Sequence, residues 1–256
     1  MCVSFMLQRV LQPLTRLFRG ILSFSMRRWV TSIINRVLLY EPLSLKMSTD
    51  VPQNHKMRQK MVVGLGNPGM SGTRHSVGMA ALAALAGRLG VAELWRGDRQ
   101  VSGEVVLSEL GETRLVLLRP RLLMNINGVS VAKAAAKFHI QPEDIYLLHD
   151  ELDKPLGKVS MKQGGSARGH NGVRSCVECL KTDVMPRVRI GISRPAGKVS
   201  VERYVLGRFT REEQEVLREV LEQSVELLLR HIIDSGTDTA LQHTKVPPGG
   251  RAAEKT

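Results

Sequence analysis

The stretch Met61–Met79, MVVGLGNPGMSGTRHSVGM, constrains the fold of this chain more than any other. It opens with a short apolar run through Leu65, which predicts a buried strand, and continues into a turn rich in glycine. Thr73 or Ser76 is the expected N-cap of a helix that follows and ends at Gly90. A strand, a tight turn and a helix in so short a stretch predict the first unit of an α/β sheet.

The rest of the chain continues this alternation of strands and helices. Apolar runs predict strands over Val101–Leu107, Arg114–Leu118, Asp144–His149, Val159–Lys162 and Arg187–Ile192, with a hairpin turn at Gly111 and Glu112. Helical spacing predicts a helix through His139 packed by Val129, Ala132 and Ala136, another from the loop Gly164–Gly172 to about Lys181, and a last one from Glu212 to about Asp234. We therefore expect an α/β fold: a single domain over residues 60–236, with a twisted mixed β-sheet flanked by helices.

The formal net charge of +13 is concentrated near the ends of the chain. Residues 1–60 hold ten Lys or Arg against only Glu41 and Asp50. A nucleic-acid site in the middle of the chain therefore depends on the local placement of bases, because phosphate contacts require nearby charge.

Residues 1–40 contain arginines, serines and apolar residues at helical spacing but no acidic residue. This composition is typical of a mitochondrial presequence. The alternative is a basic arm, or a leader that is not translated if synthesis starts at Met26, Met47 or Met57, which would leave the protein in the cytoplasm. Arginines interrupt every apolar run, so no membrane span is expected. We expect residues 1–59 to be a targeting segment or disordered arm and linker, and residues 237–256 to be a disordered tail.

Cys176 and Cys179 form a single C-x-x-C pair. One pair lacks the second half of a structural zinc site, and a redox pair belongs at a helix N-terminus, whereas these residues lie well inside a predicted helix. We expect buried, reduced thiols and no metal site.

Two glycine-rich loops imitate nucleotide-binding motifs. Gly64–Gly69 matches G-x-G-x-x-G, but Pro68 lacks an amide donor and the helical pattern resumes only after Thr73. The loop Gly164–Gly172 lacks the Lys-Ser/Thr ending of a P-loop. Neither loop favours a bound nucleotide, and no cofactor is expected.

What remains is a set of polar residues on separate loops, several of them beside glycines that let a backbone approach a ligand. A histidine on such a loop can act as a general base, because its ordinary pKa is about 6.5. The alternative is structural, since asparagine is common in turns. The set comprises Asn67, His75, Asn125, Asp150, His170 and Asn171.

Six runs of the sequence closely resemble, in order and spacing, motifs of the bacterial-type peptidyl-tRNA hydrolases: GLGNPG, TRHSVGM, LMNINGVS, LLHDELDKPLG, GGSARGHNG and RVRIGI. The resemblance covers about Lys60 to Ile233 and looks more like the animal branch of the family, with a mitochondrial location. It implies a peptidyl-tRNA hydrolase-like fold and cleavage of the ester that joins a peptide to the terminal ribose of tRNA, without a metal or cofactor.

The resemblance implies a catalytic role for His75, Asp150 and Asn67. His75 would activate water, Asp150 would orient its imidazole, and Asn67 would help to position a substrate whose amino group is blocked. The residues that would bind substrate and tRNA are Leu123, Met124, Asn125, His170, Asn171, Lys162 and Arg189. The chain departs from the family pattern at Leu123, where phenylalanine is usual, and in the Asn67–His75 spacing, which is two residues shorter.

Lys162 and Arg189 match the basic pair that clamps the 5′ phosphate of the tRNA in this family. The implied partner is peptidyl-tRNA, held by its acceptor stem, 5′ phosphate and 3′ CCA end. We expect a monomer, which fits a site that must admit a whole tRNA end. From the residues alone, each base could equally be a solvated surface charge. Two other functions are open: a catalytically silent tRNA- or RNA-binding protein on the same fold, and a nucleotide-dependent oxidoreductase.

Overall fold

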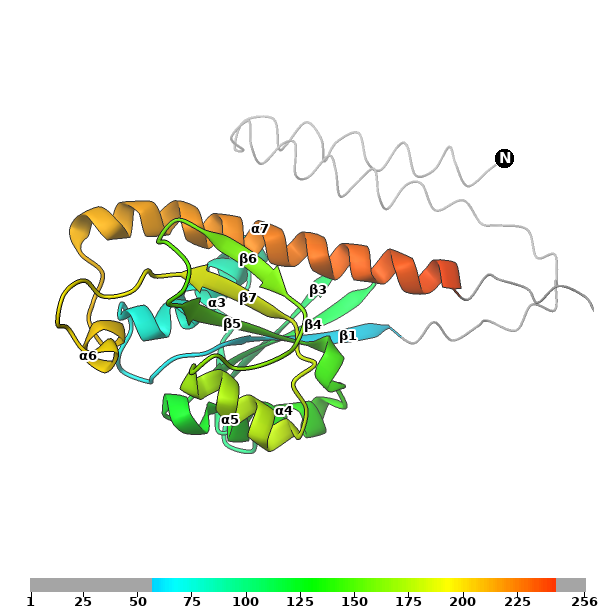
Figure 1. The fold of residues 1–256 in the computed structure, drawn as a ribbon. Coiled ribbons are helices and arrows are strands. Elements are labelled where there is room, and N and C mark those ends of the chain that lie inside the picture. The colour runs from blue at the N-terminus through cyan, green and yellow to red at the C-terminus, as the bar shows by residue number, and fades with distance from the viewer. Residues whose placement is uncertain (1–56, 243–256) are drawn as a thin grey trace, which may run out of the picture. The chain divides into compact units, whose positions relative to one another are not determined.

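A seven-stranded mixed sheet organises residues 57–242, the part of the chain that the computed structural model describes (Figure 1). The strands are β1 (Arg58–Gly64), β2 (Arg96–Asp98), β3 (Gly103–Leu110), β4 (Thr113–Pro120), β5 (Ile145–Glu151), β6 (Val159–Lys162) and β7 (Arg187–Gly191). Their order is β2-β3-β4-β1-β5-β7-β6, with β4, β1, β5 and β7 parallel to one another. Strands β3 and β6 run antiparallel to these four, and β2 is antiparallel to β3. The four parallel strands therefore bring their carboxyl ends to one edge of the sheet.

Helices cover both faces of this sheet. The helices are α3 (Val77–Arg88), α4 (Asn127–Phe138), α5 (Asn171–Leu180), α6 (Val201–Val205) and α7 (Arg211–Gln242), with short 3₁₀ turns η2 (Arg74–Ser76), η3 (Met124–Ile126) and η4 (Pro142–Asp144). Figure 1 shows α3 and α7 on one face and α4 and α5 on the other. The expected α/β sheet flanked by helices is confirmed.

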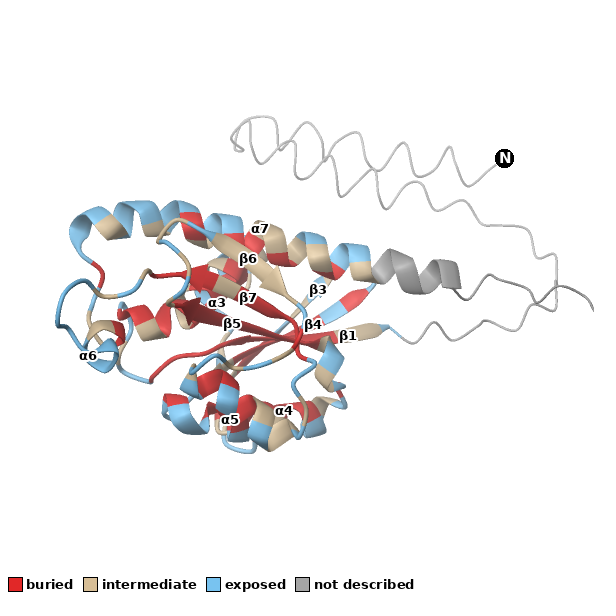
Figure 2. Cartoon of the chain, viewed as in Figure 1, coloured by how far each residue is buried: buried red, intermediate tan, exposed pale blue. Residues whose placement is uncertain are grey.

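Each face of the sheet has its own hydrophobic core, because successive side chains of a strand point to opposite faces. Val62 and Leu148 belong to the core under α3 and α7. Their strand neighbours Val63 and Leu147 belong to the core under α4 and α5. Strands β1 and β5 are buried along almost their whole length, as Figure 2 shows. Their apolar runs made these strands predictable from the sequence.

Two glycines set how closely the helices approach. A Cβ added at Gly78 would lie 2.1 Å from the Leu148 carbonyl oxygen, so the first turn of α3 rests directly on β5. A Cβ at Gly128 would lie 2.1 Å from the Ser175 carbonyl oxygen, so α4 and α5 touch through their backbones. The Gly78 contact holds the turn before α3 against the carboxyl end of β5.

Several details differ from the sequence-based expectations. The buried face of α4 is Val131, Ala134 and Ala135, whereas Val129, Ala132 and Ala136 lie outside the core. The predicted face was wrong because two polar residues, Asn127 and Ser130, are buried on the true face. Their polarity made that face look exposed in the sequence.

The ends of the helices also differ. Ser76 is the N-cap residue of α3 and Thr73 that of η2, but neither side chain makes a capping hydrogen bond. The Ser76 hydroxyl instead accepts a hydrogen bond from the Asn67 amide and lies 3.2 Å from the Thr73 hydroxyl. Helix α7 continues to Gln242 instead of ending near Asp234. The short elements β2 and α6 were not predicted. Cys176 is a buried thiol as expected, but Cys179 is only partly buried.

Residues 1–56 and 243–256 lie outside the described residues, so the expected presequence and most of the expected C-terminal tail stay predictions. Residues 237–242, which were expected to be disordered, continue helix α7. Within residues 57–242, no helix combines the length and hydrophobicity that a membrane span requires.

Candidate active site

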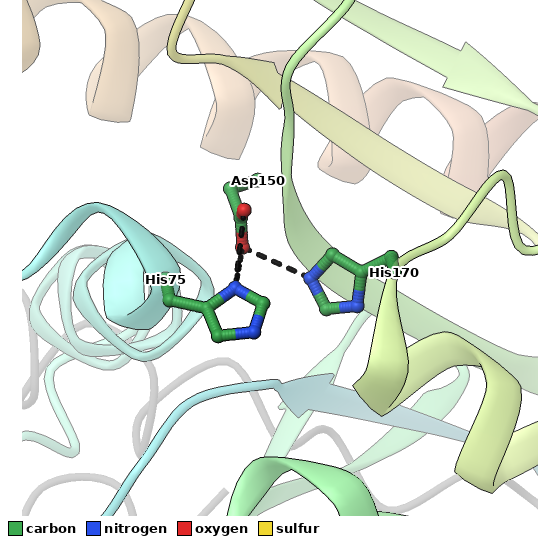
Figure 3. A group of neighbouring side chains, drawn as sticks. All are labelled: His75, Asp150 and His170. Carbon is green, nitrogen blue, oxygen red and sulfur yellow. Dashed lines mark hydrogen bonds and ion pairs between the residues drawn. The ribbon is translucent and has the colours of Figure 1, made fainter. Parts of the chain in front are cut away.

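The candidate site lies at the carboxyl edge of the parallel strands, where β5 delivers Asp150. The Asp150 side chain is buried, and His75 approaches it from η2, the turn that leads into α3 (Figure 3). His170 approaches from the loop before α5. Three side chains that are far apart in the sequence therefore converge at one point.

Asp150 holds the His75 ring by its Nδ1 atom. The distances from Nδ1 to the two carboxylate oxygens are 3.0 and 3.2 Å. A carboxylate can only accept here, so Nδ1 carries the proton and donates it. In the neutral ring this leaves a lone pair on Nε2, which points away from Asp150 in Figure 3. That atom is placed to accept a proton.

His170 donates a second hydrogen bond to the same carboxylate. Its Nδ1 accepts from the Val173 backbone amide at 3.2 Å, as the N-cap of α5. Because Nδ1 is an acceptor in that bond, the ring proton lies on Nε2, which is 2.9 Å from Asp150 Oδ1. The helix start thus fixes the tautomer of His170, and His170 in turn fixes the carboxylate.

The charge state of Asp150 follows from these contacts. Burial alone would raise the pKa of its carboxyl group, but the charge and hydrogen bonds of His170, together with those of His75, outweigh burial and hold the pKa well below its usual range. Asp150 is therefore ionised at neutral pH and can stabilise a positive charge on His75.

Asn67 connects the loop after β1 to the same site. Its side-chain oxygen accepts from the Met124 amide at 2.8 Å, which leaves the side-chain NH2 free of any acceptor among the described residues. Its own backbone amide donates to Ser76. Asn67 therefore presents a donor beside His75 while it ties two loops together.

A pocket of about 770 Å³ brings most of the predicted site residues together. Its wall also includes apolar residues of α6 and the leucine that follows β5. The predicted residues that line it are Asn67, His75, Leu123, Met124, Asn125, Asp150, His170 and Asn171. Lys162 on β6 and Arg189 on β7 do not line the pocket.

A sequence model of the peptidyl-tRNA hydrolase family matches residues 61–252 of this chain. The chain belongs to this family. The probable peptidyl-tRNA hydrolase of Mus musculus is 59% identical over 172 residues, which cover 67% of this chain and 84% of the mouse protein. The peptidyl-tRNA hydrolase of Alkaliphilus metalliredigens is 38% identical over 184 residues, which cover 71% of this chain and 96% of the bacterial protein.

Solved structures of the family share the fold. Peptidyl-tRNA hydrolase from Acinetobacter baumannii matches with a TM-score of 0.62 at 32% identity, covering 71% of this chain and 93% of the bacterial one. The family resemblance carried by the six sequence motifs is thereby confirmed, together with the fold that it implied.

This member of the peptidyl-tRNA hydrolase family also uses residues that sequence reasoning missed. Asn127 is fully buried, accepts from the Gly66 amide at 3.2 Å, and donates to the carbonyl oxygens of Leu122 and Leu123 at 2.7 and 3.0 Å. It therefore holds the loop after β1 against the loop after β4. The only signal in the sequence was its place in the run LMNINGVS.

His149 is the second missed residue. Its Nδ1 donates to the Asp150 carbonyl oxygen at 2.7 Å, and its ring lies edge-on to His170 with centroids 4.8 Å apart. Burial, aided by repulsion from the His170 ring when that ring is protonated, lowers the pKa of His149 to about 3, so the His149 ring is neutral at physiological pH. Its Nε2 has no partner among residues 57–242. The His149 ring therefore packs against the His170 ring and supports it.

The basic residues of β6 and β7 lie on one face of this antiparallel strand pair, in which Lys162 is opposite Arg187. Arg187 is buried and donates to the carbonyl oxygens of Gly165, Ser166 and Asp183, so it shapes the glycine-rich loop. Arg189 lies 3.5 Å from Glu151, a residue that lines the pocket. Desolvation and the positive charges of Arg187, Arg168 and Arg189 lower the pKa of Lys162. Positive charge is therefore concentrated beside the pocket.

His75, Asp150 and His170 are also the one group of three potential metal ligands found among the described residues. A metal ion would need lone pairs on His75 Nδ1 and His170 Nε2, the two atoms that carry protons in this hydrogen-bond arrangement. Ligation by His170 Nε2 would further require a proton on Nδ1 and loss of its bond from Val173. The geometry favours proton transfer over metal binding.

Proposed function

We propose that this chain hydrolyses the ester bond between a peptide, or an N-blocked amino acid, and the 3′-terminal ribose of tRNA, and so recycles the tRNA. The observation that carries the proposal is the His75 ring, oriented by Asp150 at Nδ1 and open to the pocket at Nε2. Membership of the peptidyl-tRNA hydrolase family supports it.

In the proposed reaction, His75 Nε2 takes a proton from a water molecule as the water oxygen attacks the ester carbonyl carbon. Asp150 stabilises the imidazolium that forms. When the tetrahedral intermediate collapses, the bond to the ribose oxygen breaks and His75 returns the proton to that oxygen. The products are a peptide carboxylic acid and a tRNA with a free 3′ hydroxyl group.

Asn67 is the proposed donor to the substrate beside His75, because it lines the pocket and the Met124 amide holds its side-chain oxygen, which leaves the NH2 group to donate. A donor aimed at the carbonyl oxygen stabilises the negative charge that develops there. Asn125 and Asn171 are exposed at the pocket and offer both donors and acceptors without charge. Leu123, Met124 and His170 complete the surface that receives the 3′ end.

Lys162 and Arg189 are the proposed site for the 5′ phosphate of the tRNA. A phosphate held there, at a fixed distance from the scissile ester, would measure the acceptor stem without reading its bases. The concentration of positive charge around Lys162 supports this assignment. We further propose a monomer, since the site must admit a whole tRNA end, and a mitochondrial location for the arginine-rich N-terminus.

The test is hydrolysis of N-acetyl-aminoacyl-tRNA by the full chain, beside unblocked aminoacyl-tRNA. We expect release of the acyl group from the blocked substrate and little release from the unblocked one. Binding of tRNA that stays fully acylated would contradict the proposal and favour a silent RNA-binding protein. Addition of NAD is expected to leave the melting temperature unchanged, which would count against an oxidoreductase.

The phosphate site has a separate test. Lys162→Ala and Arg189→Ala are each expected to raise KM for full-length substrate and to reduce the dependence of binding on salt concentration. The matched substrate is one whose tRNA lacks the 5′ phosphate. Lys162→Ala should have little effect on that substrate, and an equal loss on both substrates would refute the assignment.

A further inference from the structure

We infer that Arg74, the residue before His75, is a positioning residue that clamps the catalytic turn to the segment between α6 and α7. The inference rests on the hydrolase activity proposed above. Arg74 is a charged residue with a side chain only 8% exposed, and it lies outside the pocket. A guanidinium ion that is buried beside the proposed base, without lining the pocket, requires an explanation.

Two of the three guanidinium nitrogens have hydrogen-bond partners, while the buried Nε has none among the described residues. Nη1 donates to the Arg208 carbonyl oxygen at 2.7 Å, and Nη2 donates to Glu213 Oε2 at 2.6 Å. The group also stacks at 4.3 Å from the centre of the Tyr204 ring and at 5.2 Å from that of Phe209. All of these partners come from the short stretch that leads from α6 into α7. A planar ion with several donors is the side chain that can satisfy them together.

The backbone of the same turn is tied to the same stretch. The Arg74 amide donates to the Gly207 carbonyl oxygen at 3.0 Å, and Thr73 forms an isolated antiparallel bridge with Arg208. The turn η2 is thus held against this segment twice, by its own backbone and by the Arg74 side chain. A substitution of the Arg74 side chain leaves the backbone contacts available. It can therefore change the orientation of the turn without detaching the turn from this segment.

Glu213 performs two tasks at once. Its Oε2 atom accepts from the Thr210 amide at 2.7 Å, while the Thr210 hydroxyl accepts from the Glu213 amide at 3.3 Å. This reciprocal pair is the capping box at the start of α7. Because the same oxygen accepts from Arg74, the start of α7 and the turn that carries His75 share one carboxylate.

The clamp also joins His75 to the wall of the pocket. Tyr204 belongs to α6, and its hydroxyl donates to the Ile192 carbonyl oxygen at 2.6 Å. Val201 and Val205 of the same helix line the pocket. Figure 1 shows α6 and the start of α7 at the same end of the sheet as the start of α3. Contacts that a substrate makes with α6 are therefore linked to the base through Arg74.

Arg74→Lys tests the clamp in the full chain. Lysine keeps the charge and the stem, but a single ammonium group cannot donate along both directions of the guanidinium plane or stack flat on Tyr204. We expect kcat to fall roughly ten- to hundredfold with KM changed less than about threefold, because small misplacements of a catalytic group have effects of this size. Glu213→Gln keeps an acceptor for Thr210 and removes the charge, so we expect a smaller fall in kcat of about threefold to tenfold.

Arg119→Lys is the matched control. Arg119 also stacks on an aromatic ring, Trp95 at 4.4 Å, and pairs with a glutamate, Glu104 at 3.2 Å. It lies outside the pocket that holds His75. We expect Arg119→Lys to retain the kcat of the unaltered chain.

A second readout does not depend on turnover. Nuclear magnetic resonance of the imidazole nitrogens reports whether His75 Nδ1 keeps its proton and its bond to Asp150. We expect the Nδ1–H signal of His75 to be present in the unaltered chain and in Arg119→Lys, and to be shifted or lost in Arg74→Lys. The combined result separates the two claims: an inactive unaltered chain would refute the proposed function, while the ring spectrum would still decide the clamp.

A normal His75 spectrum in Arg74→Lys together with unaltered kcat would overturn the inference. If Arg74→Lys does not fold, Glu213→Gln decides, and an unaltered spectrum in that variant would equally overturn it.

Discussion

Acidification is expected to destabilise this protein through His149, a buried histidine beside Asp150. The pKa of a histidine in an unfolded chain is about 6.5, while burial lowers the pKa of His149 to about 3 in the folded chain. The unfolded chain therefore binds a proton below about pH 6.5 that the folded chain refuses. The stability that His149 contributes is fully present above pH 6.5 and is lost as the pH falls toward 3.

The magnitude follows from the two pKa values. One pKa unit corresponds to about 1.4 kcal/mol, so at pH 4 His149 alone lowers the free energy of unfolding by about 3 kcal/mol relative to pH 7. That is a large fraction of the stability of an ordinary domain. Asp150 acts in the same direction, since its pKa is lowered in the fold, but only below its ordinary value near 3.9. Other carboxylates whose pKa is lowered in the fold, among them Glu104 beside Arg121 and Arg119, also lose stability near pH 4. The contribution of His149 is therefore measured as a difference between two chains that share these carboxylates.

The assay is urea unfolding at several pH values between 7 and 4, for the unaltered chain and for His149→Asn. Asparagine can keep the donor to the Asp150 carbonyl oxygen but has no group that protonates in this interval. His231, whose pKa is lowered by burial and by Lys60, adds a loss in both chains and cancels in the difference. His139→Asn is the matched control, because it removes an exposed imidazole at a left-handed position that asparagine tolerates.

We expect the unaltered chain to lose about 3 kcal/mol more than His149→Asn between pH 7 and 4, and His139→Asn to behave like the unaltered chain. The same pH dependence in the unaltered chain and His149→Asn would refute the reasoning.

Three further substitutions test other parts of the structure. Asp150→Asn replaces an acceptor with an amide that donates toward the His75 imidazole, and we expect kcat to fall about a thousandfold or more without unfolding; a fall below tenfold would contradict the proposed role. Gly78→Ala places a methyl group 2.1 Å from a carbonyl oxygen of β5 and should lower the free energy of unfolding by about 3 kcal/mol, whereas Gly87→Ala, in open space on the same helix, should be neutral or stabilising by up to about 1 kcal/mol. Thermal unfolding of the pair decides this. Asn127→Ala removes a buried hydrogen bond from the Gly66 amide and two to the carbonyl oxygens of Leu122 and Leu123, so we expect both a lower melting temperature and a higher KM, and a change in melting temperature alone would limit Asn127 to a structural role.

The sequence predicted the central strands well because their side chains are apolar on both faces. The runs that became β1 and β5 could form nothing but buried strands, and the place of Asp150 at the end of one of them predicted a site. The family motifs supplied the pairing of His75 with Asp150, and the structure shows the two within hydrogen-bond distance.

The sequence failed where a residue's partner is distant in the chain. Asn127 looks like a turn residue until Gly66 is seen beside it, and Arg74 looks like a surface base until Glu213 is seen beside it. The face of α4 was wrong for a related reason, since a buried asparagine disguises a core position as a polar one. Short elements such as α6 carry too few residues to show a period.

The most direct test of the whole account is single-turnover hydrolysis of N-acetyl-aminoacyl-tRNA by His75→Ala beside the unaltered chain, with tRNA binding measured on the same samples. General-base catalysis by a positioned histidine contributes about a hundredfold to ten-thousandfold. We expect His75→Ala to lose at least that lower factor in rate while it binds tRNA within about threefold of the unaltered chain. A rate within about threefold of the unaltered chain would show that His75 is not the base and would refute the proposed mechanism.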